Sequence, residues 1–128
     1  LGVELIIHHS DSYAATLVPY MIEMGIDIWQ GAMSSNNVPE LVKKYGKDIT
    51  IMGGIDTALI DNDHYTREKD AEVVKEVCDA CGPLYFIPCS TAGDDISTFP
   101  GAKEMLSEEI AKYSEVYFKE HGLSKQEA

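Results

Sequence analysis

Four polar side chains follow directly on an apolar run near the start of the chain. The predicted first strand, residues 3–7, ends in the apolar residues 5–7, which lead into His8, His9, Ser10 and Asp11. A short apolar run is typical of a buried strand, and polar groups at its end have no core to join, so they face a pocket or water. Imidazole, hydroxyl and carboxylate groups bind metals and substrates and exchange protons. We therefore expect a functional site at this position.

Three later runs, at residues 26–29, 49–52 and 84–87, end in the same way. They are followed by Gln30 and Gly31, by Gly53 to Asp56, and by Pro88 to Ser90. Four strands that each finish in polar or small residues predict one shared rim. We expect the contacts with substrate to come from Ser10, Asp11, Trp29, Gln30 and Gly54.

The candidate metal ligands are His8 and Cys89, because imidazole and thiolate both bind zinc. His8 and Ser10 alternate along the strand and share a side, whereas His9 points to the other side unless the strand has already ended. A catalytic zinc site needs more ligands than these two, and the hydroxyl of Ser10 is a poor third. The residue types alone would allow nucleophilic catalysis by a Ser–His pair, although no orienting acid or nucleophile elbow is evident.

The candidate catalytic residues are His8, His9 and Asp56. Asp56 comes after two glycines, which allow a backbone to approach a ligand closely. Its carboxylate either orients a histidine, binds substrate, or serves only the turn. Trp29, the single tryptophan, is either a core residue or a pocket wall.

Amphipathic stretches separate the four apolar runs. Helical spacing of apolar residues predicts helices that begin near Ser12, Asn37, Thr66 and Gly101. Thr16, Asn37 and Thr66 are suitable caps. Strands that alternate with helices imply a parallel sheet with right-handed crossovers. Residues 57–65 are expected to form a long loop.

The chain is therefore predicted to be α/β, with four βα units in one domain over residues 1–122 and a polar tail at 123–128. A complete eight-fold barrel takes about 250 residues, so the 128 residues correspond to half of a TIM-type barrel. A small open doubly wound sheet is the alternative. The chain opens at Leu1 almost directly into a strand, which suggests a fragment of a longer protein.

The formal net charge of −12 argues against a nucleic-acid partner, because phosphate binding needs clustered Lys and Arg. No apolar run is long enough to span a membrane. Three cysteines disfavour a disulfide framework, so a reducing cytoplasm is expected. The open edges of half a barrel predict association, either with a missing N-terminal half or as a homo-oligomer.

Four blocks of the sequence resemble the C-terminal half of the uroporphyrinogen decarboxylase superfamily. The blocks are residues 6–12, 25–31, 52–56 and 85–89, and the resemblance extends over about residues 2–118. The superfamily implies a TIM-type barrel. It includes decarboxylases of the heme pathway and zinc-dependent methyltransferases that serve corrinoid proteins.

The resemblance also implies which residues to compare. The methyltransferases hold zinc with a His-x-Cys pair and a later cysteine; His8 matches the histidine, Cys89 the later cysteine, and Ser10 stands in place of the middle cysteine. The decarboxylases carry Gly-His-Gly where this chain has residues 87–90. A corrinoid-linked methyltransferase or demethylase is therefore the leading expectation, with a corrinoid protein as partner. A decarboxylase of a tetrapyrrole or other carboxylated substrate, or an inactive fragment, are the alternatives.

Overall fold

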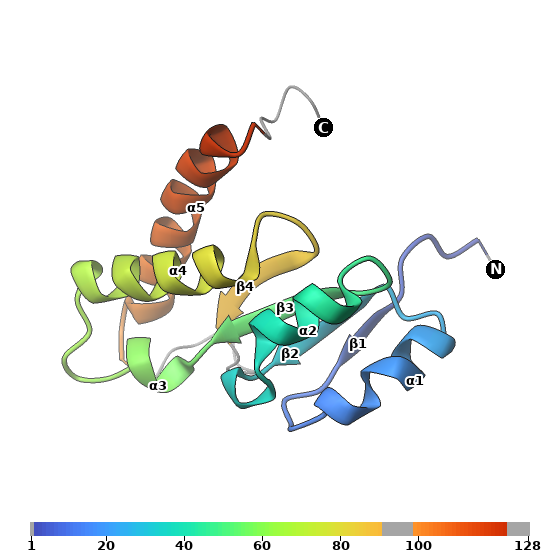
Figure 1. Cartoon of the computed structure of the whole chain (residues 1–128). Coiled ribbons are helices and arrows are strands. Elements are labelled where there is room, and N and C mark those ends of the chain that lie inside the picture. Colours follow the sequence, from blue (N-terminus) through green and yellow to red (C-terminus); the bar gives the residue numbers. More distant parts are fainter. Residues whose placement is uncertain (1, 91–98, 123–128) are drawn as a thin grey trace.

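The computed structural model describes residues 2–90 and 99–122, and the predicted tail at 123–128 lies outside them. Its centre is a four-stranded parallel sheet in the order β1-β2-β3-β4, with helices between the strands (Figure 1). The predicted α/β class and the alternation of strands and helices are confirmed. The strands are β1 (Ile7–His9), β2 (Ile28–Ala32), β3 (Thr50–Ile55) and β4 (Phe86–Ser90). The helices are η1 (Ala15–Leu17), α1 (Val18–Glu23), η2 (Ser34–Asn36), α2 (Val38–Tyr45), α3 (Thr57–Ile60), α4 (Arg67–Cys81) and α5 (Ala102–Glu120).

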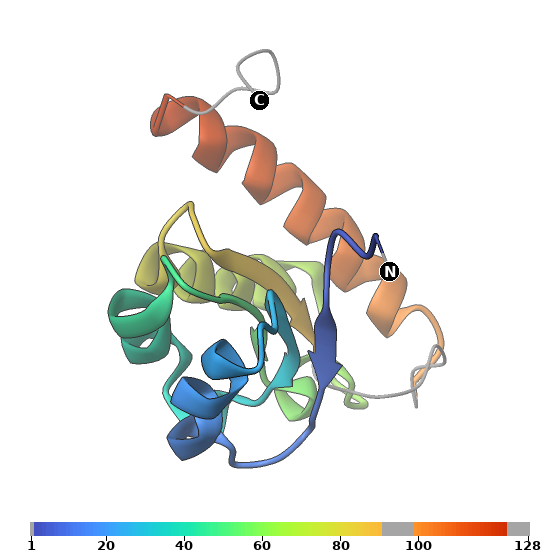
Figure 2. The same cartoon turned by 90° about the vertical axis from the view of Figure 1, so that its right-hand side faces the viewer.

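The helices α1, α2 and α4 lie on one face of the sheet, and α5 packs beside α4 (Figures 1 and 2). A single row of side chains across the sheet shows which face is buried. Trp29, Ile51 and Phe86 are register partners on β2, β3 and β4, and they are 0%, 0% and 9% exposed. This row and the helices form the hydrophobic core.

The neighbouring row points away from the helices, because successive residues of a strand face opposite sides. It runs from His9 through Gln30 and Met52 to Ile87. Gln30 and Met52 are partly exposed, and Ile87 is 39% exposed. We call this side the open face of the sheet.

All four strands begin later than their apolar runs suggest; β2 and β3 start at Ile28 and Thr50 rather than at residues 26 and 49. The carboxylate of Asp27 accepts the Ile6 amide at 2.8 Å, so β1 starts only at Ile7 and contains both histidines. Tyr85 has a left-handed φ of 67°, which interrupts the extended backbone before β4. The predicted strands at residues 3–7 and 84–87 were therefore placed too early, and Cys89 lies within β4.

The helix starts are confirmed in part. Thr66 caps α4 by accepting the Lys69 amide at 3.2 Å. Asn37 precedes α2 as expected, but its side chain makes no cap hydrogen bond, and its backbone is left-handed, with φ 55°. Thr16 is not the cap of α1: the helix begins after Leu17, with Pro19 in its first turn. The expected loop at 57–65 contains the short helix α3, which the sequence analysis missed.

Gly53 is required where β3 bends past β2. The register between these strands shifts between Gln30 and Ala32, and Gly53 has a φ of 147°. A Cβ atom at Gly53 would meet the carbonyl oxygen and amide nitrogen of Ala32 closer than non-bonded atoms can approach. Only glycine fits both the backbone conformation and the contact.

Replacing Gly53 therefore tests the close approach of the two strands. Gly53→Ala should lower the free energy of unfolding by about 2–5 kcal/mol, because it adds a backbone clash to an unfavourable φ. Gly25→Ala is the matched control: Gly25 also has a positive φ, 78°, but open space where its Cβ would lie, so its cost is about 1 kcal/mol. Urea unfolding of both variants measures the difference, and equal losses would contradict the clash.

Candidate functional site

His9, the last residue of β1, and Asp11, just after it, form a polar pair. Nε2 of His9 lies 3.1 Å from Oδ2 of Asp11, and the two side chains are 54% and 35% exposed. The carboxylate of Asp11 lies against Gly31 of β2, where a Cβ atom would collide with Oδ1. Glycine at position 31 therefore makes room for Asp11 at the carboxyl edge of the sheet.

The thiol of Cys89 lies at the same edge, near the end of β4. Burial raises its pKa, the charge of Asp11 raises it further, and the ammonium of Lys103 on α5 opposes both effects. The Sγ–H donates to the carbonyl oxygen of Ser90 at 2.9 Å. Cys89 is therefore a neutral thiol at neutral pH, and its environment includes the carboxylate of Asp11, just after β1, and the ammonium group of Lys103 on α5.

The two adjacent histidines take opposite sides of β1. His8 is the register partner of the buried Trp29, whereas His9 is the partner of Gln30 on the open face. Paired residues of a parallel sheet share a face, so His9 belongs with Asp11 and the open face. His8 lies on the helix side of an edge strand and is exposed. Of the two predicted catalytic histidines, the structure joins only His9 to another predicted site residue.

A hydrogen bond between Trp29 and Ser10 links this edge of the sheet to the hydrophobic core. Trp29 is fully buried and donates its indole N–H to the carbonyl oxygen of Ser10 at 3.1 Å. The hydroxyl of Ser10 lies 2.8 Å from the hydroxyl of Ser12. Trp29 is thus a core residue in this structure, the first of the two roles that the sequence left open. Gln30 stands beside His9 on the open face.

Gly54 lies within β3 and Asp56 directly follows it, and neither residue contacts the pair His9–Asp11 in any interaction seen among the described residues. Oδ1 of Asp56 accepts the Ala58 amide at 2.9 Å and so caps α3. Gly54 faces the helices, where its Cβ would touch Phe86 and Val77. The structure therefore gives Asp56 the turn role that was one of its alternatives.

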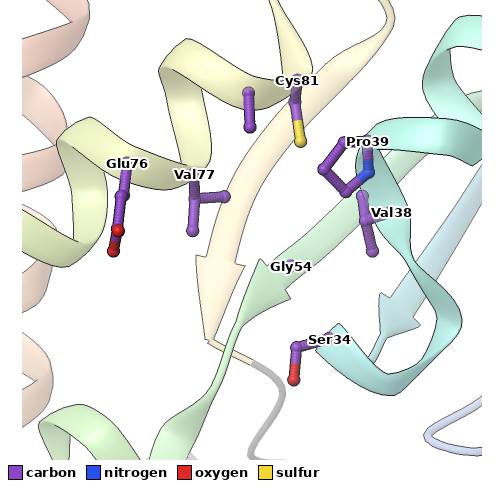
Figure 3. A pocket seen from close by; sticks show the side chains of 8 residues that line it. Ser34, Val38, Pro39, Gly54, Glu76, Val77 and Cys81 are labelled. Atoms are coloured by element: carbon purple, nitrogen blue, oxygen red, sulfur yellow. The ribbon is translucent and has the colours of Figure 1, made fainter.

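Gly54 also forms part of an apolar groove between α2 and α4, with a volume of about 260 Å³. Figure 3 shows Val38 and Pro39 of α2 facing Val77 and Cys81 of α4 across this groove. The groove lies on the helix side of the sheet, away from the pair His9–Asp11.

Asn36 is the residue of this region that the sequence analysis missed. It is 3% exposed, and its Oδ1 accepts the amides of Ala14 and Ala15 at 2.8 and 3.0 Å. Its Nδ2 donates to the carbonyl oxygens of Ser12 and Met33 at 3.0 and 3.1 Å. One side chain therefore joins the segment after β1 to the segment after β2. An asparagine in a polar loop gives no sequence signal for such burial.

The described residues do not make up a metal site. Within 2–90 and 99–122, no group of three or more His, Cys, Asp or Glu side chains could hold a metal ion. The predicted ligands His8 and Cys89 do not complete a zinc site with any described residue. Zinc at this rim would need ligands from elsewhere.

The sequence matches no protein-family model, and a search of curated proteins found no significant match. Among the described residues, no helix combines the length and apolar character needed to cross a membrane.

The bonds of Asn36 predict that its loss will loosen the carboxyl edge. Asn36→Ala should lower the free energy of unfolding by about 2–4 kcal/mol, because it leaves two buried amides without an acceptor. Asn62→Ala is the control, because Asn62 also bonds backbone groups, Ala58 O and His64 N, but at an exposed turn. Urea unfolding should show about 1 kcal/mol or less for the control. Equal effects would mean that the buried hydrogen bonds of Asn36 add no more stability than those of an exposed turn.

Proposed function

We propose that the chain is the C-terminal half of a TIM-type barrel enzyme related to the uroporphyrinogen decarboxylases, in the corrinoid-linked methyl-transfer branch. The proposal combines the four sequence blocks with one structural observation. His9 and Asp11 are paired at the carboxyl edge of a parallel sheet, and the charge of Asp11 acts on the thiol of Cys89 near the end of β4. In parallel α/β folds, the carboxyl ends of the strands are where substrates bind.

The pair His9–Asp11 suits proton transfer. A carboxylate that contacts one imidazole nitrogen fixes the ring and leaves the other nitrogen free to exchange a proton. An acceptor of the thiol class loses its proton when it is methylated, and His9 is placed to take that proton on the open face. The neutral thiol of Cys89 and the ammonium of Lys103 would contact the same ligand from the other side of the rim.

The partners follow from the same proposal. A corrinoid protein would carry the methyl group, and an N-terminal half of the same chain would supply the remaining strands. Zinc enters only if that half adds the missing ligands, and no step above depends on it. The three cysteines are unpaired, which suits a reducing cytoplasm.

The decarboxylase remains the alternative. It would need cations to bind the carboxylates of its substrate. Lys103, which acts electrostatically on Cys89, is the candidate for this role among the described residues.

Methyl transfer can be tested with the full-length protein, methylcobalamin and a simple thiol, by following the absorbance change as the corrinoid loses its methyl group. His9→Gln should lower the rate by about a hundredfold or more, because it removes a general base. His8→Gln is the matched control and should leave the rate unchanged, since His8 lies on the other side of β1. A larger loss for His8 would support the assignment implied by the sequence resemblance over the one derived from the register. Release of carbon dioxide from a tetrapyrrole, without demethylation, would favour the decarboxylase.

We also propose that the 128-residue chain, on its own, associates through its open face. Ile7 and Ile87 are 57% and 39% exposed on that face, and burying apolar surface is worth about 25 cal/mol per Å². The edge of β1 adds unpaired backbone groups, which favour pairing with another strand.

Light scattering coupled to size-exclusion chromatography should therefore give at least twice the chain mass of 14.1 kDa. Ile7→Lys should shift the protein towards the monomer, because it places a charge on the open face. Met24→Lys is the control: Met24 is 71% exposed but lies after α1, on the helix side. A wild-type monomer at micromolar concentration would show that the open face is stable in water.

A further inference from the structure

Asp70 is a buried carboxyl group without a hydrogen-bond partner. It lies in the first turn of α4 and is 0% exposed. Neither of its carboxylate oxygens has a hydrogen-bond partner among the described residues. Buried polar groups nearly always have such a partner, and a buried unpaired carboxylate is strongly unfavourable. The position therefore favours the neutral, protonated form of Asp70.

The neighbouring cation is already used by other residues. Nη1 of Arg67 lies 2.9 Å from Oε1 of Glu109, and Nη2 lies 2.8 Å from Oε2 of Glu108. Nζ of Lys112 lies 3.3 Å from the same oxygen of Glu109. Two cations thus balance two carboxylates between α4 and α5, and an ionised Asp70 would add an unbalanced negative charge.

The other elements packed against α4 offer no compensation. Helix α3 and strand β3 carry no charged side chain, and the titratable group of β4 is the thiol of Cys89. The charged residues of α2 are exposed. The charged groups that act on Asp70 are Glu109 on α5 and Arg67 on α4. Burial raises the pKa of Asp70, Glu109 raises it further, and Arg67 offsets part of the effect.

We propose that α5 packs against α4 only while the buried Asp70 is neutral, and that ionisation of Asp70 beside Glu109 releases α5. The proposal does not depend on the proposed function. Its effect would reach the rim, because Lys103 lies at the start of α5 and acts electrostatically on Cys89. Release of α5 would move that ammonium group away from the rim at high pH.

The direction of the pH dependence follows from the proton balance. Below the pKa of an ordinary aspartate, Asp70 is neutral in both the docked and the released state, so docking is at its strongest. As the pH rises, the released state ionises first and docking weakens, until the pH passes the raised pKa of the docked state. Above that point the loss is complete and constant.

Cys78 reports on the packing of α5 against α4. It is 6% exposed on α4, next to Asp79, which accepts a hydrogen bond from the Tyr113 hydroxyl of α5. Release of α5 should therefore expose the thiol of Cys78 to a labelling reagent. Comparing two proteins at the same pH removes the reagent's own dependence on thiolate concentration.

The experiment measures the labelling rate of Cys78 by peptide mass spectrometry in the folded chain, from about pH 3, below the ordinary pKa of aspartate, to about pH 9. The ratio of the wild-type rate to the Asp70→Asn rate should rise with pH, by about tenfold for each unit by which the docked pKa exceeds the released one. Glu72→Gln is the matched control, because Glu72 lies on the same helix with a side chain 67% exposed. It should follow the wild type at every pH.

Two results would overturn the proposal. One is a wild-type to Asp70→Asn ratio that does not change with pH. The other is faster labelling of Asp70→Asn at all pH values, which would mean that the carboxylate is ionised and accepts a bond in the docked state. Should Asp70→Asn fail to fold, carbon-13 NMR of the wild-type Asp70 carboxyl decides the question. A pKa of Asp70 at or below the ordinary value for aspartate would exclude the proposed dependence of α5 packing on pH.

Discussion

The burial of one row of side chains, Trp29, Ile51 and Phe86, determines which way the neighbouring side chains point in the part of the sheet before the register shift between Gln30 and Ala32. A shift of one residue in any strand would carry this row to the opposite face and expose it. Since Trp29 and Ile51 are fully buried, the register of β2 and β3 is strongly specified. The register of β1 follows, because His8 pairs with Trp29. His9 therefore lies on the open face, and the candidate site depends on the core for its orientation.

Packing of the strands alone does not hold the segments beyond them. The chain leaves β1 and β2 in irregular segments whose backbone groups need partners, because buried amides and carbonyls are costly when unpaired. Asn36 satisfies four such groups from both segments. The side-chain amide of Asn36 thus links two backbone segments at the carboxyl edge, as hydrogen bonds between strands link the sheet. It also fixes the path of the chain just after Asp11.

The sequence was sufficient for the α/β class with its parallel sheet and intervening helices, but not for the contacts at the carboxyl edge of that sheet. Apolar runs alternating with amphipathic stretches predict parallel βα units, and parallel strands bring residues such as His9 and Cys89 to one edge. Alternation alone places His8 and His9 on opposite sides, but only the tertiary packing of Trp29 shows which of them faces the helices. The burial of Asn36 and Asp70 depends on segments distant in sequence, and no local pattern indicates it.

Asp70 and Asn36 show two ways in which this fold accommodates a buried polar side chain. Asn36 has its donors and acceptors matched by backbone groups, so its burial fixes one geometry at any pH. Asp70 is unmatched, so its burial is compatible with the fold only in the neutral form, and the packing of α5 acquires a dependence on proton concentration. Because α5 begins beside the rim with Lys103, electrostatics at Cys89 depend on how firmly that helix is docked. The β1 and β2 side of the site is thus held by hydrogen bonds that do not titrate, whereas the β4 side is held through a helix contact that does.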